Sequence, residues 1–231
     1  MQQKLRMGLW IVATVALVWP AAGIAQEQPP KNSLNLELRV AKRTLVVAEP
    51  LQIGLTLRNQ GTAPMTLDDN FDLDSEEVEV LIADISSNTA GMANQWIRFK
   101  KALRAREREK RTVTLGPGEE RSLTCLLAYD THRDDVTFSK TGRYEVRIVF
   151  HYDILDYSRK VVSNSVVIEV KEPGITDRDA LTTWRNDKRL LLAIQGQTDD
   201  RDRANSAARA FKEKFPSSIY TRYAEKMLQL P

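Results

Sequence analysis

Apolar residues recur at every second position in several separate stretches before residue 171, and this alternation limits the possible folds more than any other feature. A period of two is typical of strands that bury one face, because successive side chains of a strand point to opposite sides of the sheet. Turn signals such as Asn59-Gln60-Gly61 and Gly116-Pro117-Gly118 separate the stretches. The pattern predicts a mainly β chain, with an antiparallel β-sandwich over residues 33–171. The clearest runs are 34–40, 51–57, 123–129, 144–152 and 166–170.

The apolar period changes after Pro173-Gly174. Ala204, Ala208 and Phe211 lie three or four positions apart, which is the spacing of one helix face. Pro216 interrupts this pattern, and a second apolar stripe follows it to the end of the chain. The sequence therefore predicts a small α-helical C-terminal segment over residues 175–231.

Two groups of short sequence segments carry a family resemblance. The run Val46-Val47-Ala48-Glu49-Pro50-Leu51 and the strand that ends at Asn59-Gln60-Gly61 resemble the opening of secreted bacterial immunoglobulin-like sandwiches. Leu115-Gly116-Pro117-Gly118-Glu119 and Gly142-Arg143-Tyr144-Glu145-Val146 are similar to the later strands of the same modules. The layout is that of the intracellular-proteinase-inhibitor-like domain, and it implies an immunoglobulin-like fold over residues 33–171. The long charged region 86–114 departs from that layout and counts against a proteinase-inhibitor role.

The helical tail is similar to one tetratricopeptide-type hairpin. The matching positions are Ala207, Ala208, Phe211, Phe215-Pro216, Ser218, Tyr220, Tyr223-Ala224 and Leu228. One hairpin cannot bury its own apolar face, since such repeats rely on neighbours. The resemblance implies that the tail packs against the sandwich or against a protein partner.

The first 25 residues read as a cleaved signal peptide. Lys4 and Arg6 precede an apolar run over 7–19, and Pro20 and the small-residue stretch 21–25 follow. This order of positive, apolar and small residues is the one that signal peptidase recognises. The alternative is a retained membrane anchor, for which the run is short. We expect cleavage before Gln26, a flexible lead over 26–32, and a periplasmic or secreted protein.

Charge argues against nucleic-acid binding. The chain has 34 basic and 31 acidic residues. Removal of Lys4 and Arg6 with the signal peptide leaves 34 − 2 = 32 basic residues, so the mature chain is nearly neutral. Cys125 is the single cysteine, so no disulfide can form within the chain.

The sequence carries no catalytic motif that we can identify, and we expect neither enzymatic activity nor a cofactor. Cys125 shares an alternating apolar face with Leu123 and Leu127, which predicts a core position. His151 alternates with Phe150 and is expected at the surface. His132 stands among acidic residues but lacks a second imidazole nearby, which makes it a poor metal-ligand candidate.

The acidic segment 68–79 is a calcium candidate, because its oxygen-bearing residues follow the spacing of a calcium loop. Leu73 replaces the glycine that such loops need, and strands flank the segment. The alternative is a solvated acidic loop. The residues at positions one, three, five, seven and twelve are Asp68, Asn70, Asp72, Asp74 and Glu79.

Six basic residues occupy even-numbered positions over 98–110, and Lys101 is the basic residue of this range at an odd position. A β-ribbon would place them on one face, suited to an anionic glycan, an anionic lipid surface or an acidic partner. A helix would disperse them, and a solvated edge is the third possibility. They are Arg98, Lys100, Arg104, Arg106, Arg108 and Lys110.

Together these features predict an exported, non-catalytic binding module of the bacterial envelope with a protein partner. The alternative is an inhibitor of an extracytoplasmic proteinase.

Overall fold

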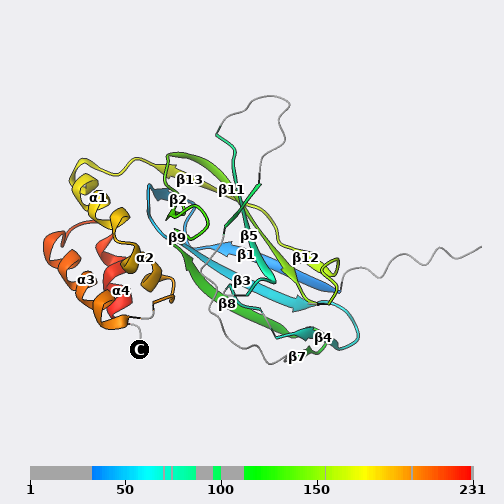
Figure 1. Ribbon diagram of the computed structural model, residues 1–231. Coiled ribbons are helices and arrows are strands. Elements are labelled where there is room, and N and C mark those ends of the chain that lie inside the picture. The colour runs from blue at the N-terminus through cyan, green and yellow to red at the C-terminus, as the bar shows by residue number, and fades with distance from the viewer. Residues whose placement is uncertain are drawn as a thin grey trace, which may run out of the picture. The chain divides into compact units, whose positions relative to one another are not determined.

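The computed structural model describes residues 33–69, 71–73, 75–86, 96–99, 112–153, 155–198 and 200–229 (Figure 1). One layer of the fold is a three-stranded antiparallel sheet in the order β1-β3-β8. Its strands are β1 (Leu34–Val40), β3 (Leu51–Asn59) and β8 (Glu120–Leu127).

The opposing sheet has the order β2-β13-β11-β5-β6, and β12 also pairs with β11. Its pairs are antiparallel except β2 with β13, which run parallel although more than a hundred residues separate them. Its strands are β2 (Thr44–Val46), β5 (Val78–Asp84), β6 (Trp96–Phe99), β11 (Gly142–His151), β12 (Lys160–Val162) and β13 (Val166–Lys171). Two small ribbons complete the β part, and they pair β4 (Met65–Asp68) with β7 (Thr112–Leu115) and β9 (Tyr129–Asp130) with β10 (Asp135–Val136).

The predicted alternation explains how the two sheets meet. On β3 every odd-numbered residue from Leu51 to Leu57 is buried, and its neighbours on the ladder include Leu38 and Leu123. The opposing sheet contributes buried residues such as Val146 and Ile148 from β11. Full burial of one such side chain stabilises the fold by roughly 1.5–3 kcal/mol. The prediction of a mainly β, antiparallel sandwich is therefore confirmed.

The predicted change of period after residue 173 is also confirmed. A 3₁₀ turn, η1 (Ile175–Asp177), leads into four helices. None of the helices among the described residues is both long and apolar enough to cross a membrane. The helices are α1 (Arg178–Asn186), α2 (Lys188–Ile194), α3 (Arg201–Lys214) and α4 (Thr221–Leu228).

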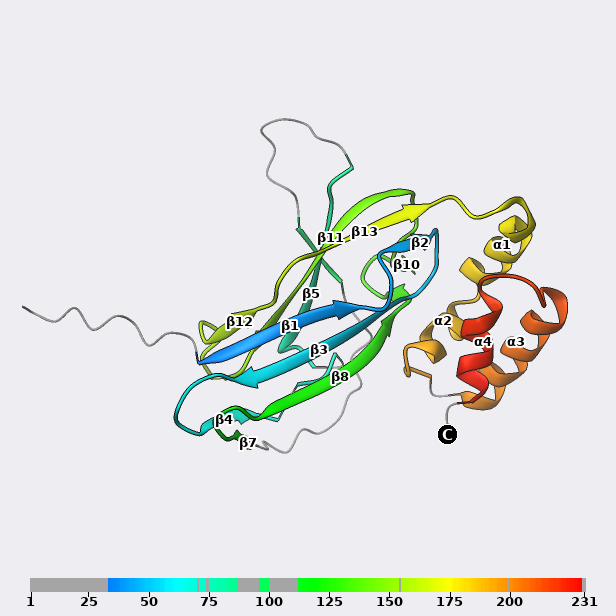
Figure 2. The ribbon, with the colours of Figure 1, turned by 180° about the vertical axis from the view of Figure 1, so that it is seen from behind.

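The helices gather at the end of the sandwich where the β2–β3 turn lies (Figure 2). Trp184 of α1 is fully buried, stacks on Tyr220 at a centroid distance of 5.4 Å, and donates from Nε1 to the Ala48 carbonyl at 3.0 Å. The Tyr220 hydroxyl donates to the Val47 carbonyl at 2.7 Å. Ala48 adopts a left-handed backbone with φ of 63°. We call Val47–Glu49 and the aromatic residues that contact it the joint.

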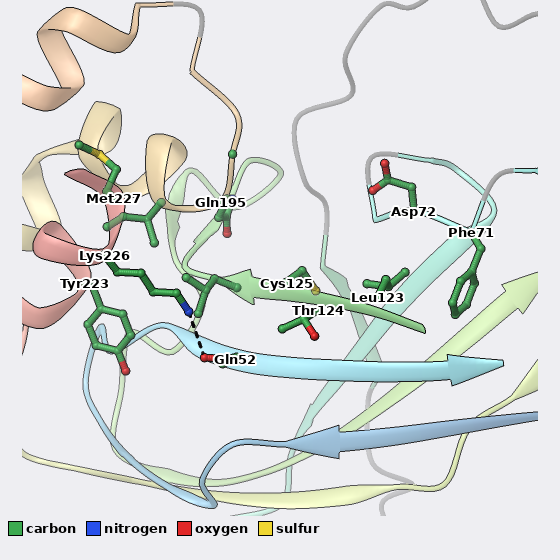
Figure 3. A pocket seen from close by; sticks show the side chains of 13 residues that line it. Gln52, Phe71, Asp72, Leu123, Thr124, Cys125, Gln195, Tyr223, Lys226 and Met227 are labelled. Carbon is green, nitrogen blue, oxygen red and sulfur yellow. Dashed lines mark hydrogen bonds between the residues drawn. The ribbon is translucent and has the colours of Figure 1, made fainter. Parts of the chain in front are cut away.

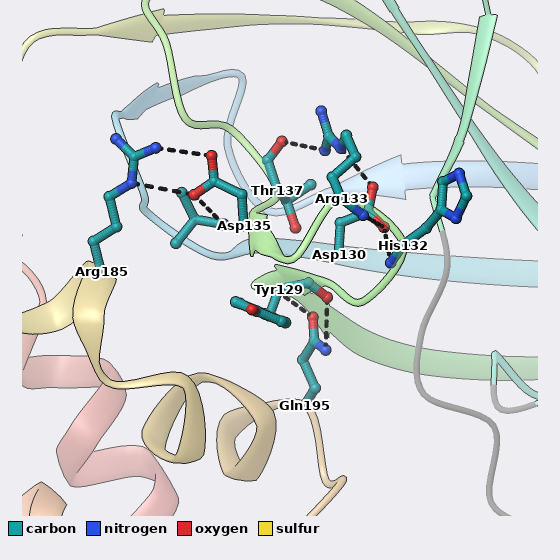
Figure 4. A network of polar contacts seen from close by, with 9 residues as sticks. Tyr129, Asp130, His132, Arg133, Asp135, Thr137, Arg185 and Gln195 are labelled. Atoms are coloured by element: carbon teal, nitrogen blue, oxygen red, sulfur yellow. Dashed lines mark hydrogen bonds and ion pairs between the residues drawn. The ribbon is translucent and has the colours of Figure 1, made fainter.

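A second set of contacts ties the helices to the β9–β10 ribbon (Figure 4). Arg185 of α1 binds both carboxylate oxygens of Asp135, at 3.1 and 2.8 Å. Lys188 pairs with Asp134, which also accepts from the Tyr129 hydroxyl at 2.6 Å. The tail is thus fixed to the sandwich by polar contacts at two separate places. The predicted boundaries of the sandwich and the tail, at 171 and 175, remain predictions.

Candidate functional site

A groove of about 420 Å³ lies where β8 approaches the helical tail (Figure 3). Its floor is the segment Leu123–Leu126 of β8, and Gln52 extends it onto β3. Met227 and Lys226 of α4 line one end, and Phe71 lines the other. The groove therefore combines a strand edge, apolar side chains, the Lys226 ammonium group at one end and the Asp72 carboxylate at the other.

The outward backbone of β8 follows from its register. Asn59 of β3 donates from its backbone to the Glu119 carbonyl at 3.0 Å, so odd-numbered residues of β8 exchange hydrogen bonds with β3. The even-numbered residues Ser122, Thr124 and Leu126 must then direct their N–H and C=O groups away from β3. Among the described residues, none pairs with these outward groups. The β8 edge thus presents the outward hydrogen-bonding groups of Thr124 and Leu126 to the groove, and those of Ser122 lie outside its lining.

Gln195, at the C-terminal end of α2, shows how this edge binds an amide (Figure 4). Its Oε1 accepts from the backbone N–H groups of Ala128 and Tyr129, at 2.5 and 2.7 Å. Its Nε2 donates to the Tyr129 carbonyl at 3.1 Å. The carboxamide is buried just beyond the last residue of β8, where the Ala128 carbonyl accepts from the Thr137 N–H at 3.0 Å. In the described part of the chain, the outward groups from Ser122 to Leu126 have no such partner.

A cationic rim borders the groove around Glu49. This carboxylate is 2 % exposed, accepts from the Tyr223 hydroxyl at 2.7 Å and from the Val46 N–H at 3.0 Å, and pairs with Lys42 and Arg222. Burial opposes its ionisation, but the contacts with Lys42, Tyr223 and Val46 outweigh burial and lower the pKa of Glu49. Burial and the Glu49 charge raise the pKa of the Tyr223 hydroxyl well above its usual range.

Lys226 is the cation of the rim that reaches the groove itself. Its Nζ donates to Gln52 Oε1 at 3.3 Å, which is a neutral partner. Within the described part of the chain, no carboxylate lies within ion-pair distance of Lys226. A smaller hollow of about 270 Å³ adjoins the groove and is lined by Lys42, Arg222 and Lys226. Two cations therefore pair with the buried carboxylate and a third lies beside the same hollow, so the cations outnumber the carboxylate and this corner of the molecule attracts anions.

The described residues of the calcium candidate lie on different parts of the fold. Asp68 ends β4, Asp72 lines the far end of the groove, and Glu79 lies on β5, where it pairs with Arg98 at 3.0 Å. Asn70 and Asp74 lie outside the described residues. In the described ranges, no cluster of three or more carboxylate, imidazole or thiol groups could hold a metal ion. The calcium site stays a prediction.

The basic stripe is described only at its first member. Arg98 lies on β6 and also donates to the Glu76 carbonyl at 3.2 Å, so it contributes to the sandwich edge. Lys100, Arg104, Arg106, Arg108 and Lys110 lie outside the described residues. The choice between ribbon and helix stays open.

The prediction of a surface position for His151 is wrong. The side chain is 8 % exposed, and its Nδ1 donates to the Tyr157 carbonyl at 2.9 Å. The segment between β11 and β12 folds back, so that the Tyr157 ring covers the imidazole at a centroid distance of 5.0 Å. Alternation predicts only the side of the sheet, and a loop distant from that pattern can bury the outer side. His132 is exposed, and the neighbouring Asp130 carboxylate is bound by Arg133 at 2.6 Å.

Cys125 faces the core as predicted, but its side chain is less buried than a core position implies. The side chain is half-buried and packs against the edge of the core, where it lines the groove. The reason is that β8 ends its sheet, so its inward-facing residues have a covering neighbour on one side only. Sequence reasoning also missed Gln195 and Lys226. A polar residue directly after the apolar run Leu190–Ile194 was the available signal for Gln195.

No family model and no curated protein matches the chain. Solved structures share a similar arrangement at low scores. The AlkC alkylpurine DNA glycosylase of Pseudomonas fluorescens matches at 16 % identity and a TM-score of 0.34, over 60 % of this chain and 30 % of that one. The CARDB domain of the PF1109 protein from Pyrococcus furiosus, solved with di-metal ions, matches at 15 % identity and 0.31, over 60 % and 87 %.

The sporulation control protein Spo0M of Bacillus subtilis matches at 11 % identity and a TM-score of 0.37, over 65 % of this chain and 54 % of that one. This chain thus matches less than a third of the glycosylase and about half of Spo0M. These likenesses are too weak to carry any function to this chain, and its proposed role rests on its own geometry.

Proposed function

We propose that this chain is an exported, non-catalytic interaction module of the bacterial envelope, which binds a protein partner through the groove between β8 and α4. The observation that carries the proposal is the β8 edge, whose outward groups have no partner among the described residues and whose segment Leu123–Leu126 lines a groove with apolar side chains. An open edge is a ready template for another chain, and proteins that do not use such edges usually cover or charge them.

The chemistry of the groove supports binding rather than catalysis. A catalytic thiol at Cys125 would need an imidazole within hydrogen-bond reach. The chain has two histidines, and neither lines the groove, because His132 lies in the β9–β10 turn and His151 lies under Tyr157. What remains is an apolar surface with backbone groups, one cation and one carboxylate, which is the composition of a recognition site.

The envelope location rests on the first 25 residues, which lie outside the described part of the chain. The order of charged, apolar and small residues there supports export. A mature chain without an internal disulfide depends on its apolar core for stability, and the core of the sandwich is extensive.

The experiment is site-specific photocrosslinking in cells that express the full chain. A photoreactive residue at Thr124, in the groove, should capture an envelope protein, whereas one at Arg209, exposed on α3, should not. Capture of a proteinase, with loss of its activity on addition of the purified chain, would favour the inhibitor role instead. Equal labelling from both positions, or capture of cytoplasmic proteins alone, would contradict the proposal.

A further inference from the structure

Among the described residues, β8 is an edge strand of the three-stranded layer. The outward groups of Ser122, Thr124 and Leu126 repeat at the spacing of a partner strand. The N–H of the next outward residue, Ala128, donates to Gln195 Oε1 at 2.5 Å, so an amide oxygen already meets an outward N–H of this chain. A peptide backbone has both the acceptors and the donors that the outward groups of β8 need.

The two sides of this edge differ in character. On the side that faces the sandwich interior, Leu123 and Cys125 are half-buried and lie near Phe71. On the other side, Lys226 reaches Gln52 without a carboxylate partner among the described residues. Because side chains of a strand alternate between two faces, an added strand would place one set against apolar atoms and the other set beside the cation.

We propose that the groove binds an extended segment of an acidic partner, which adds to β8 as a fourth strand of the β1-β3-β8 sheet. The segment alternates apolar residues, which face Leu123 and Cys125, with acidic residues, which face Lys226 and the cationic rim. Main-chain hydrogen bonds supply affinity in this mode of recognition, and the alternate side chains supply selectivity. This inference rests on the proposed function and names the chemistry of the partner.

The probe for this inference is a capped, fluorescein-labelled ten-residue peptide that alternates valine and glutamate. We expect saturable binding to the full mature chain by fluorescence anisotropy. A valine–lysine peptide should bind at least about tenfold more weakly, since a tenfold change corresponds to only 1.4 kcal/mol. A valine–glutamate peptide with alternate backbone N-methyl groups should also lose binding, because it keeps the side chains but lacks donors for the ladder.

Protein variants separate the contribution of the Lys226 charge to peptide binding from that of the main-chain hydrogen bonds of β8. Lys226→Glu should weaken binding about tenfold, whereas the control Arg209→Glu, an exposed charge reversal on α3, should leave it unchanged. Thr124→Pro removes an outward N–H without removing a hydrogen bond to β3, and proline is tolerated at such edge positions. It should abolish peptide binding while far-UV circular dichroism stays unchanged. If Thr124→Pro unfolds the chain, the N-methylated peptide provides the same test on the native protein.

Amide hydrogen exchange gives the decisive pattern. On saturation with the peptide, the amides of Ser122, Thr124 and Leu126 should gain protection, while those of Leu123 and Cys125, already bonded to β3, should not. Three results would overturn the proposal. The first is no saturable binding at millimolar peptide, and the second is equal binding of the lysine peptide or the N-methylated peptide. The third is protection of the amides without this alternation. The alternating pattern in a concentration-dependent dimer without peptide would assign the edge to a second copy, and would also overturn the proposal. Photocrosslinking at Thr124 to an envelope protein would uphold the proposed function in each of these cases.

Discussion

At the scale of single residues, two buried polar side chains each bind several hydrogen-bonding groups at once. Gln195 satisfies three backbone groups of the segment after β8, and Glu49 gathers four donors at the joint. Removal of Gln195 would leave buried backbone groups without a partner, and removal of Glu49 would do the same to the Val46 N–H and the Tyr223 hydroxyl, while Lys42 and Arg222 are partly exposed to water. Loss of one partner leaves the full desolvation cost of the other, which exceeds the net value of the hydrogen bond itself.

Gln195→Leu should therefore lower the free energy of unfolding by about 1–3 kcal/mol, because buried N–H groups at Ala128 and Tyr129 lose their acceptor. Urea unfolding followed by circular dichroism measures this change. Gln60→Leu, on an exposed turn, is the matched control and should have little effect. A Gln195 variant as stable as the control would show that water or a shifted side chain replaces the amide.

Glu49 makes stability depend on pH in a defined direction. Its pKa is lower in the folded state than in the unfolded chain, so its contribution is complete above the usual glutamate value of about 4.3 and is lost as pH falls through the folded value. Glu49→Gln should destabilise the protein by about 1–3 kcal/mol near neutral pH, because hydrogen bonds to the buried carboxylate are weakened while Lys42 and Arg222 stay partly solvated. The difference from the unmodified chain should shrink as pH falls below about 4.

Urea unfolding at a series of pH values between 2 and 7 tests this dependence. Glu120→Gln, which removes the exposed partner of Arg58, is the control and should change stability by less than about 1 kcal/mol. A Glu49→Gln difference that stays constant over the whole series would contradict the lowered pKa.

At the scale of elements, the four helices behave as a dependent part of the fold. Trp184 and Tyr220 are fully buried, and each donates a hydrogen bond to a carbonyl of the β2–β3 turn. The prediction from the sequence, that the tail needs another surface to pack on, agrees with these contacts. The tetratricopeptide resemblance describes the spacing of the aromatic residues. Their rings pack on one another within the tail, and the polar atoms of Trp184 and Tyr220 bind the sandwich.

A peptide of residues 176–231 should accordingly be mostly disordered in water, since ordering costs roughly 1–2 kcal/mol per residue and short helices are marginal alone. A chain that ends at Lys171 should remain a folded β protein, because the strands alone supply the alternating side chains buried between the two sheets. Far-UV circular dichroism and thermal melting of both pieces measure this. A sharp monomeric transition in the peptide, or an unfolded truncated sandwich, would contradict the assignment.

At the scale of the whole molecule, the sequence predicts the parts better than their assembly. Alternation predicts the strands, the buried leucines of β3 and the change to helices, because each depends on a local period. The parallel pairing of β2 with β13 has no local signal. The groove was not predicted either, since Gln52, Cys125 and Lys226 come together only through the docking of α4 on the sandwich.

Export is the prediction that concerns the whole chain. We expect the exported protein to begin at Gln26, because the small residues at 23 and 25 suit the signal peptidase. Intact-mass analysis and N-terminal sequencing of the protein from the envelope fraction measure this directly. Recovery of the envelope protein with Met1 still attached would show instead that the segment is retained as an anchor.

The joint also imposes an order in time. Val47 and Ala48 are among the first residues of the fold to be synthesised, while Tyr220 and Trp184, which bind their carbonyls, are among the last. Contacts that span so much of the chain form slowly, because the intervening loop must close before they contribute any stability. A chain threaded from its N-terminus through a translocation pore would therefore reach the far side before Trp184 and Tyr220 could bind the carbonyls of the β2–β3 turn. The joint could close only after the last helix had emerged.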